Sequence, residues 1–446
     1  MERAIAHRPE LMLTPPPVPG SAAGLGALRA LLQGHSLLAP LAALHADLGD
    51  VFQLPFPNFN PVVLVGPEAA RFVLVDSRDD FRWRIETDPV ARLLRHGLLM
   101  EDGDSHDRLR ALMTPALHRR LIERQVATMW ECADEVTSDW RDGQSIDVLN
   151  AMRRIALLCL TRALYGVDIA PDLSRMWKPL LRTLAYIAPG AWLVWPAVPR
   201  PGYARALQQM DDYLFRLIAL RRASGPTGDD LLSLLVNSGL SDDLIRDQLL
   251  TMLIAGHDTA TASLAWALYA LGKHPPVLAQ ARAEVDSVLN GEAPTASNIQ
   301  QLHYLERVIK ETLRLYPPIH VGNRLAARDL DFAGRRIPAG ARVLFSIYLT
   351  HRHPRYWPEP ECFDPERFNP EKTSPPAPFT YLPFGGGPRF CIGAVLAQME
   401  VKVVLARVLQ RFDFQLLSGE VGLRMGATLE PDKLRMMVKR INNRAR

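Results

Sequence analysis

Cysteine is scarce in this chain, and its cysteines are not spaced in pairs. The 446 residues contain four, Cys132, Cys159, Cys362 and Cys391, and no two of them form a CxxC motif. A chain this long can bury a large core without disulfides, so the pattern argues against a disulfide-stapled secreted domain and against an iron–sulfur module. We therefore expect a cytoplasmic protein with reduced thiols.

No pattern typical of a targeting or membrane-spanning segment is evident in the first residues. Residues 1–10 carry charges without an apolar stretch of signal-peptide type, and no N-terminal run is long enough to cross a bilayer. Residues 14–20 are proline-rich, and no Gly/Ser linker divides the rest of the chain. We expect an N-terminal proline-containing segment (1–27), one large domain (28–446), no transmembrane anchor and a monomeric state.

The chain has no large excess of positive or negative charge. There are 52 basic and 48 acidic residues, and 48% of the chain is hydrophobic. This balance is that of an ordinary globular protein and gives no reason to expect a nucleic-acid partner.

Against this background, one stretch carries unusual chemistry, Phe384-Gly-Gly-Gly-Pro-Arg389-Phe-Cys391-Ile-Gly393. Its glycines allow a tight turn and close approach to a flat ligand, and a helix-compatible apolar run comes directly after it. Free N–H groups at that helix start are expected to hold Cys391 as a thiolate, which is a soft, electron-donating metal ligand. A single thiolate without a neighbouring Cys or His suits one axial position on heme iron better than a zinc site.

The second feature is a long helix predicted for residues 241–273. Ser241 is a good N-cap, and Pro275-Pro276 lies just beyond the last turn. The helix is apolar on nearly all sides, which predicts burial, yet His257, Asp258, Thr259 and Thr261 interrupt it. A satisfied polar cluster between helices is the ordinary explanation for such residues.

Read as Phe-x-x-Gly-x-Arg-x-Cys-x-Gly, the cysteine loop resembles the heme-binding signature of the cytochrome P-450 (heme-thiolate monooxygenase) family. Ala255-Gly256-His257-Asp258-Thr259 likewise resembles the family's oxygen-activation motif. Five such motifs occur in the family's order from about residue 28 onward. The resemblance implies a mainly α fold with a small β region, a long central helix over heme b (iron protoporphyrin IX) and the cysteine loop beneath.

The resemblance also assigns roles to individual residues. Cys391 would ligate the iron, Phe384 would shield its thiolate, and Gly393 would complete the loop. Thr259 and Asp258 would manage dioxygen and protons, with Ala255 and Gly256 leaving room beside the helix. The groups expected to hold the heme propionates are His106, Arg110, Arg324 and Arg389, with His106 at a position where tryptophan is commoner. A buried cluster of Glu311, Arg314 and Arg367 would support the fold and heme loading.

Local patterns predict the other elements. We expect one or two helices in 28–48, a hairpin from 51–56 and 61–65, a helix from Pro67 to Val75 and a helical region over 117–166. Further predictions are a helical lid over 171–223, interrupted near Trp192 and Trp195, and short C-terminal strands in 412–446. The Trp pair would admit an apolar substrate, touch a membrane surface or pack beneath a loop.

The implied function is insertion of one oxygen atom from O2 into a C–H or C=C bond of an apolar substrate. The sequence contains no flavin or iron–sulfur domain, so a separate ferredoxin or flavodoxin with its NAD(P)H reductase is expected to supply electrons, docking on the Cys391 side through basic residues.

Two alternatives are a heme-thiolate isomerase or dehydratase acting on a peroxide and a non-catalytic heme protein. The cysteine loop and the His351–Trp357 segment resemble fatty-acid and carotenoid hydroxylating branches. Terpenoids and polyketides also remain open, and we favour a terpenoid or fatty-acid-like substrate.

Overall fold

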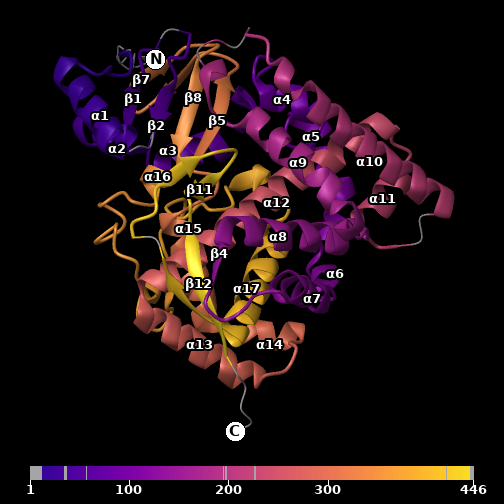
Figure 1. Cartoon of the computed structure of the whole chain (residues 1–446). Coiled ribbons are helices and arrows are strands. Elements are labelled where there is room, and N and C mark those ends of the chain that lie inside the picture. Colours follow the sequence, from indigo (N-terminus) through magenta and orange to yellow (C-terminus); the bar gives the residue numbers. More distant parts are fainter. Residues whose placement is uncertain are drawn as a thin grey trace, which may run out of the picture.

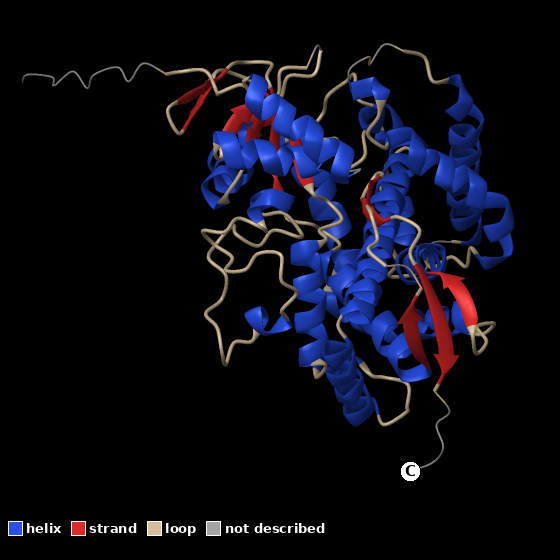
Figure 2. Cartoon of the chain, turned by 60° about the vertical axis from the view of Figure 1, so that its left-hand side comes forward, coloured by secondary structure: helices blue, strands red, loops and turns tan. Residues whose placement is uncertain are grey.

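The computed structural model describes residues 13–34, 38–56, 58–193, 195, 198–225, 228–417 and 419–441. In this part of the chain helices dominate, and the strands lie in separate regions with helices between them (Figures 1 and 2). The predicted absence of a leader in residues 1–10 concerns positions outside the described part.

The α-helices make up most of the described chain. They are α1 (Ser21–Gly34), α2 (Leu38–Leu48), α3 (Pro67–Arg71), α4 (Pro89–Leu94), α5 (Gly103–Met113), α6 (Arg119–Glu123), α7 (Val126–Thr137), α8 (Val148–Tyr165), α9 (Leu173–Ile187), α10 (Ala204–Ser224), α11 (Leu231–Asn237), α12 (Asp242–Lys273), α13 (Pro275–Leu289), α14 (Ala296–Gln300), α15 (His303–Leu315), α16 (Ile347–Thr350) and α17 (Ala394–Arg411). A π-helical turn, η1 (Phe72–Asp76), continues α3, and a 3₁₀ turn, η8 (Gly387–Arg389), lies in the cysteine loop.

The largest sheet has the strand order β1-β2-β8-β5-β3 and mixes parallel with antiparallel pairs. Its strands are β1 (Val51–Gln53), β2 (Val62–Leu64), β3 (Phe81–Arg82), β5 (Val321–Ala326) and β8 (Arg342–Ser346). β1 and β2 form the predicted hairpin, with Val51 opposite Leu64. The β2–β8 pair is parallel, which requires a long crossover, and nearly the whole helical body lies between these two strands in sequence.

Three smaller sheets complete the β region. β4 (Gln144–Asp147), β12 (Arg435–Arg440) and β9 (Phe412–Leu416) form one, β6 (Leu330–Phe332) and β7 (Arg335–Ile337) a second, and β10 (Leu423–Met425) and β11 (Leu429–Pro431) a third. The C-terminal strands were predicted, but β4 interrupts the region 117–166 that was expected to be helical throughout. β4 is mostly exposed and pairs with the distant β12, so its own sequence gives little signal for it.

Helix α12 lies at the centre of the helical body (Figure 1). It begins where predicted: the Ser241 side chain accepts a hydrogen bond from the Leu244 N–H, and the helix ends at Lys273. Nearly every residue of its middle and C-terminal half is buried, including Leu264, Ala265 and Trp266. The main core cluster joins α12 to α7, α8, α10, α15 and α17, so α12 is a rigid support for any side chain it carries.

At the N-terminus the predicted helix start is wrong, because α1 begins at Ser21 rather than Leu28. A domain boundary between residues 27 and 28 would therefore cut a helix. Thr14 bridges to Arg335 on β7, so the segment before α1 is also in contact with the body.

Candidate active site

The cysteine loop is a tight turn closed by main-chain hydrogen bonds. The Cys391 N–H donates to the Phe384 carbonyl (2.9 Å), and the Phe390 N–H donates to the Gly387 carbonyl (3.0 Å). Gly387 has φ +63°, and a Cβ there would lie 2.6 Å from the Leu74 carbonyl oxygen. A side chain at this position would meet both left-handed strain and a backbone clash with η1. The glycine therefore sets how closely the loop approaches η1.

Cys391 itself lies just before α17, with Gly393 as the N-cap residue. The surrounding protein desolvates the thiol and raises its pKa, although a hydrogen bond from the Gly393 N–H acts in the opposite direction. The expectation that the loop alone would hold a thiolate is thus wrong in direction. Desolvation outweighs the hydrogen bond at the helix start here.

A buried cation lies near this loop without a counter-ion. Arg324 on β5 is 2% exposed, its Nη1 donates to the Asn323 carbonyl (2.8 Å), and its guanidinium stacks 3.3 Å from the centre of the Trp83 ring. Among the described residues no carboxylate lies within ion-pair distance of it. Desolvation and the charge of Arg389 lower the pKa of Arg324. A buried guanidinium in this condition favours an anionic ligand.

The other predicted propionate-binding groups gather around the same place. Arg389 is half-buried; its Nη2 lies 2.9 Å from Asp102, while desolvation lowers its pKa to about 10. His106 is buried on α5 and bonds Asp107 through Nδ1 (2.7 Å); burial lowers its pKa, and the charges of Arg389 and Arg110 act in the same direction. The charge of Arg110 also reaches the Cys391 thiol. The structure therefore brings all four predicted groups near the cysteine loop.

These features fit a heme. One soft sulfur ligand, a glycine-lined turn and a buried guanidinium without a carboxylate partner, that of Arg324, are groups that suit an iron porphyrin with two carboxylates.

Helix α12 carries the residues that were predicted to activate oxygen. Ala255 is exposed although the residues before it are buried, and Thr259 is partly exposed. The Thr259 hydroxyl donates to the Ala255 carbonyl (2.6 Å) and also lies 3.4 Å from the Gly256 carbonyl. Both residues therefore face an accessible space inside the fold, and the hydroxyl has a main-chain acceptor at rest.

Gly256 has a packing role that its motif did not suggest. A Cβ on it would lie 2.5 Å from Cδ1 of Leu160 on α8. The glycine thus lets α8 and α12 approach closely. Its predicted role in leaving room for dioxygen stays a prediction.

Asp258 is held in a buried network that the sequence did not reveal. Its carboxylate lies 3.1 Å from Nη2 of Arg153 on α8 and accepts a hydrogen bond from the Thr428 hydroxyl (2.8 Å). Arg153 also pairs with Glu430, which in turn pairs with Arg424. A charged residue within an apolar helix (Asp258) or an apolar strand (Glu430) was a signal that such a network exists. Nothing in the sequence, however, indicated which charged residues pair with each other.

Segments far apart in the sequence meet near α12. The Leu98 N–H donates to Gln248, and the Leu429 N–H donates to the Pro318 carbonyl (2.9 Å) beside the 42% exposed Ile319. Trp266 on α12 donates from Nε1 to the Leu429 carbonyl (2.9 Å). Leu98 and Leu429 therefore contact α12 directly, and Pro318 joins the segment before β5 to Leu429.

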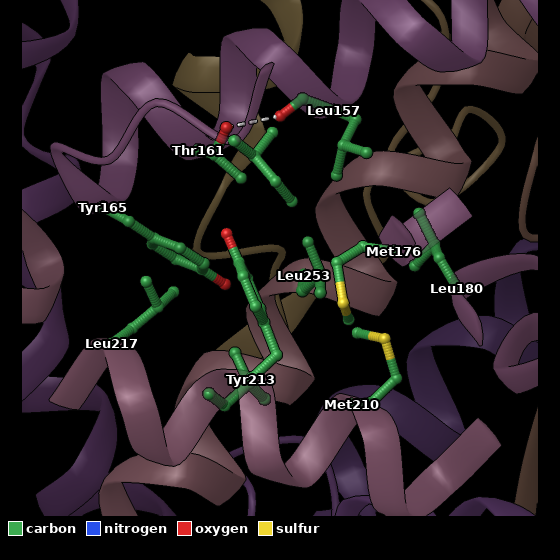
Figure 3. A pocket seen from close by; sticks show the side chains of 11 residues that line it. Leu157, Thr161, Tyr165, Met176, Leu180, Met210, Tyr213, Leu217 and Leu253 are labelled. Carbon is green, nitrogen blue, oxygen red and sulfur yellow. Dashed lines mark hydrogen bonds between the residues drawn. The ribbon is translucent and has the colours of Figure 1, made fainter. Parts of the chain in front are cut away.

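The lid region is helical on both sides of its interruption, as predicted, in α9 and α10. Trp192 is partly buried and donates from Nε1 to the Ala188 carbonyl (2.7 Å), whereas Trp195 is 59% exposed. Beneath these helices, an apolar pocket lies between α8, α9, α10 and α12 (Figure 3). Leu157, Met176 and Leu253 line it, and the Thr161 hydroxyl is bonded back to the Leu157 carbonyl (2.9 Å).

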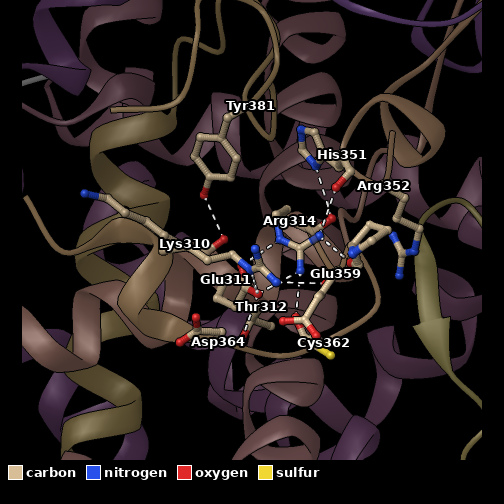
Figure 4. A network of polar contacts seen from close by, with 12 residues as sticks. Lys310, Glu311, Thr312, Arg314, His351, Arg352, Glu359, Cys362, Asp364 and Tyr381 are labelled. Atoms are coloured by element: carbon tan, nitrogen blue, oxygen red, sulfur yellow. Dashed lines mark hydrogen bonds and ion pairs between the residues drawn. The ribbon is translucent and has the colours of Figure 1, made fainter. Parts of the chain in front are cut away.

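The predicted acid–arginine cluster is present (Figure 4). Glu311 and Arg314 are fully buried on α15, and Nε and Nη2 of Arg314 bind the two carboxylate oxygens at 2.7 Å each. Nε of Arg367 lies 3.4 Å from Glu311. Arg314 also donates to the carbonyls of His351, Pro360 and Cys362, so it connects α15 to the chain after α16.

Over the described residues, no helix combines the length and apolar character needed to cross a bilayer.

Comparison with known proteins identifies the family. The profile named Cytochrome P450 matches residues 15–432. Cytochrome P450 139 of Mycobacterium tuberculosis is 35% identical over 391 residues, covering 84% of this chain and 90% of that protein. Cyclooctatin synthase of Streptomyces melanosporofaciens is 34% identical over 431 residues, covering 91% and 93%, and cyclooctat-9-en-7-ol 5-monooxygenase of the same organism is 32% identical over 425 residues, covering 92% of each.

Solved structures agree. The retinoic acid-bound cyanobacterial CYP120A1 superposes with a TM-score of 0.82 at 26% identity, covering 96% of this chain and all of the other. The heme domain of cytochrome P450DA gives 0.85 at 27% identity, covering 96% and 98%. The chain belongs to the cytochrome P450 family and is a heme-thiolate monooxygenase.

Proposed function

We propose that this protein oxygenates a mostly hydrocarbon small molecule, with heme held by Cys391 and by His106, Arg110, Arg324 and Arg389. The observation that carries the proposal is the unpaired, 2% exposed guanidinium of Arg324 near the cysteine loop. Phe384, whose ring centre lies 6.4 Å from that of Phe390, is partly buried beside Cys391 and would limit water at the sulfur. Bound there, heme supplies dioxygen activation and oxygen transfer.

The residues of α12 would then manage protons. The Thr259 hydroxyl, bonded to the Ala255 carbonyl at rest, would turn toward dioxygen and present a proton from Oγ1. The Asp258 carboxylate already accepts bonds from Arg153 and Thr428. It must exchange one of these partners before it can pass a proton onward, so Arg153 and Thr428 limit when that transfer occurs.

For the substrate, we favour a terpenoid or fatty-acid-like molecule. The segments that meet on α12 include apolar residues such as Leu98, Leu253 and Ile319. One relative is named for an unsaturated alcohol, cyclooctat-9-en-7-ol, and one similar structure holds retinoic acid, a hydrocarbon chain with one carboxylate. Both suit an apolar site with few polar contacts.

The first test is the ferrous–carbon monoxide difference spectrum of the purified protein beside a Cys391→Ala variant. A strongly red-shifted Soret band that disappears in the variant supports Cys391 as the iron ligand. An unshifted band, or a band unchanged in the variant, contradicts the assignment. An Arg324→Gln variant should retain the shifted band but release heme faster to an apoprotein acceptor.

The second test concerns the reaction. Family members receive electrons from redox partners, and we propose a ferredoxin or flavodoxin with an NAD(P)H reductase for this chain. Candidate terpenoids and fatty acids are screened by the change of the heme absorption spectrum on binding. Turnover that needs O2 and NAD(P)H supports the proposal, whereas turnover of a peroxide without either favours the isomerase or dehydratase alternative. Binding of gas with no turnover of any candidate would favour a non-catalytic heme protein.

A further inference from the structure

Two histidines and an aspartate converge where α2, β1 and the chain after α16 meet. Nε2 of His45 lies 2.8 Å from Oδ1 of Asp50, and Nε2 of His353 lies 3.1 Å from the same oxygen. The three ligand atoms all lie within 4.8 Å of one another, and no other cluster of this kind occurs among the described residues. The site is formed by residues with no assigned part in heme binding or oxygenation.

The topology of the main sheet explains why these residues meet. Asp50 immediately precedes β1, and Val51 pairs with Leu64 near the end of β2. Leu64 lies beside Phe345 in the parallel β2–β8 pair, so Asp50 lies at the sheet end where β8 leads into α16. His353 comes shortly after α16, and His45 lies in the last turn of α2. Figure 1 shows α2 and α16 on the same side of the molecule.

The main chain around each of the three residues is fixed. The Asp50 carbonyl accepts from the Val65 N–H (2.9 Å), and the His45 carbonyl accepts from the Gly49 N–H (2.9 Å). The Gly66 N–H donates to the Thr350 hydroxyl (3.0 Å), a buried contact that joins the β2 end to α16. The side chains of His45 and His353 are only 15% and 12% exposed, so their rings have few alternative positions. A cluster held in this way is preorganised for a ligand.

We propose that His45, Asp50 and His353 bind a zinc ion, with water in the fourth position. Two imidazole nitrogens and one carboxylate are a typical zinc donor set, with bonds of about 2.0–2.2 Å. Tetrahedral geometry at those lengths separates ligand atoms by roughly 3.3 Å. The observed separations of 2.8 and 3.1 Å therefore need to open by only a few tenths of an ångström.

Proton positions are compatible with binding at a small cost. Nδ1 of His353 accepts a hydrogen bond from the Arg355 N–H (3.2 Å), which places the ring proton on Nε2, facing Asp50. When zinc binds Nε2, the ring proton moves to Nδ1. Nδ1 can then no longer accept the hydrogen bond from the Arg355 N–H. Arg355 is exposed, so water can accept from its N–H instead. The 47% exposed side chain of Asp50 provides the route from solvent.

Next to the cluster lies a second carboxylate. The His353 ring packs against Tyr356 with 5.0 Å between ring centres, and the Tyr356 hydroxyl donates to Glu68 (3.1 Å). Asp50 offsets one of the two charges of a zinc ion, and Glu68 is a further carboxylate connected to the cluster through Tyr356. Bound zinc would join α2 and β1 to the segment after α16 and stabilise the folded state by mass action.

The test uses tag-free, heme-loaded protein freed of other metals and titrated calorimetrically with zinc chloride at pH 7.5 in a non-chelating buffer. The expected result is one saturable ion per chain. At a free zinc concentration one hundred times Kd, the thermal midpoint should rise by about 3 °C. The double variant His45→Ala/His353→Ala should lose both effects, and Asp50→Asn should weaken binding at least about tenfold.

Two matched variants test whether other groups bind the ion. His303→Ala removes an exposed histidine outside the cluster, and Cys362→Ser removes an exposed thiol; both should bind zinc as the parent does. The heme absorption spectrum verifies that every variant is folded. Absence of saturable binding in the folded parent, or equal binding by the parent and the double variant, would overturn the proposal.

Discussion

Arg153 on α8 and Asp258 on α12 form a buried ion pair, with 3.1 Å between Nη2 and Oδ1. The same Nη2 also binds Glu430, so one guanidinium joins two carboxylates from different parts of the chain. Burial and the charge of Asp258 raise the pKa of Glu430. Arg153 therefore pairs with both acids at once, while Glu430 also pairs with Arg424.

Replacing Arg153 with methionine should destabilise the protein by about 3–5 kcal/mol, because it leaves two buried carboxylates without their shared cation. Denaturant titration measures the change. The neighbouring Arg154 is exposed on the same helix, and Arg154→Met should stay within about 0.5 kcal/mol. Adding Glu430→Gln to Arg153→Met should recover part of the loss; no recovery would refute the account of the network.

Arg314→Lys should also cost about 3–5 kcal/mol, because lysine cannot reproduce the paired bonds to Glu311 together with those to three carbonyls. Heme content after expression and the denaturation midpoint should both fall. Arg336→Lys is the matched control, since its pair with Asp329 is exposed and should contribute about 0–1 kcal/mol. Equal effects of the two variants would contradict this prediction.

Gly256→Ala should destabilise the protein by about 1–3 kcal/mol, because the added methyl group would lie 2.5 Å from Leu160. The cost is expected despite alanine's higher helix propensity of about 1 kcal/mol. Gly24→Ala in α1 meets no atom within 4 Å and should be neutral or stabilising.

The same contact predicts coupling. In the double variant Gly256→Ala/Leu160→Ala, the small side chain at 160 should accommodate the new methyl group, so the total loss should be smaller than the sum of the single losses. If the losses in stability are additive, Leu160 does not restrict the size of the side chain at position 256.

His257 should make stability depend on pH. It is fully buried, and desolvation lowers its pKa to about 4, with Asp258 and Arg153 as the neighbouring charges. Below about pH 6.5 the unfolded chain binds a proton that folded His257 does not. Stability should therefore fall between pH 6.5 and 4 and this contribution should level off below pH 4, for a total of roughly 3 kcal/mol.

The check is the denaturation midpoint as a function of pH for the parent, His257→Gln and the exposed-site variant His303→Gln. Glutamine can still donate to the Arg153 carbonyl, which accepts from His257 Nε2 at 3.1 Å. The slope should decrease only in His257→Gln. His320 and His351, whose pKa values burial lowers to about 4 and about 3, continue to contribute. An unchanged slope in His257→Gln would contradict the assignment.

The sequence by itself determined the family, the mainly helical fold, the bounds of α12 and the spacing of the cysteine loop. These features depend on neighbours along the chain: caps, periodicity, glycines and contiguous motifs. It also predicted the partners Glu311 and Arg314, which are three residues apart on one helix and so share a face whatever the fold.

Only the tertiary structure decided which distant groups meet. Asp258 lies 105 residues from Arg153 and 170 from Thr428, and no local pattern pairs them. The raised pKa of Cys391 depends on how much protein surrounds its sulfur, which a loop sequence does not specify. Asp50 reaches His353, 303 residues away, because β2 pairs with β8 in parallel. Burial, charge pairing and ligand geometry are properties of contacts in space, so they appear only when the chain is folded.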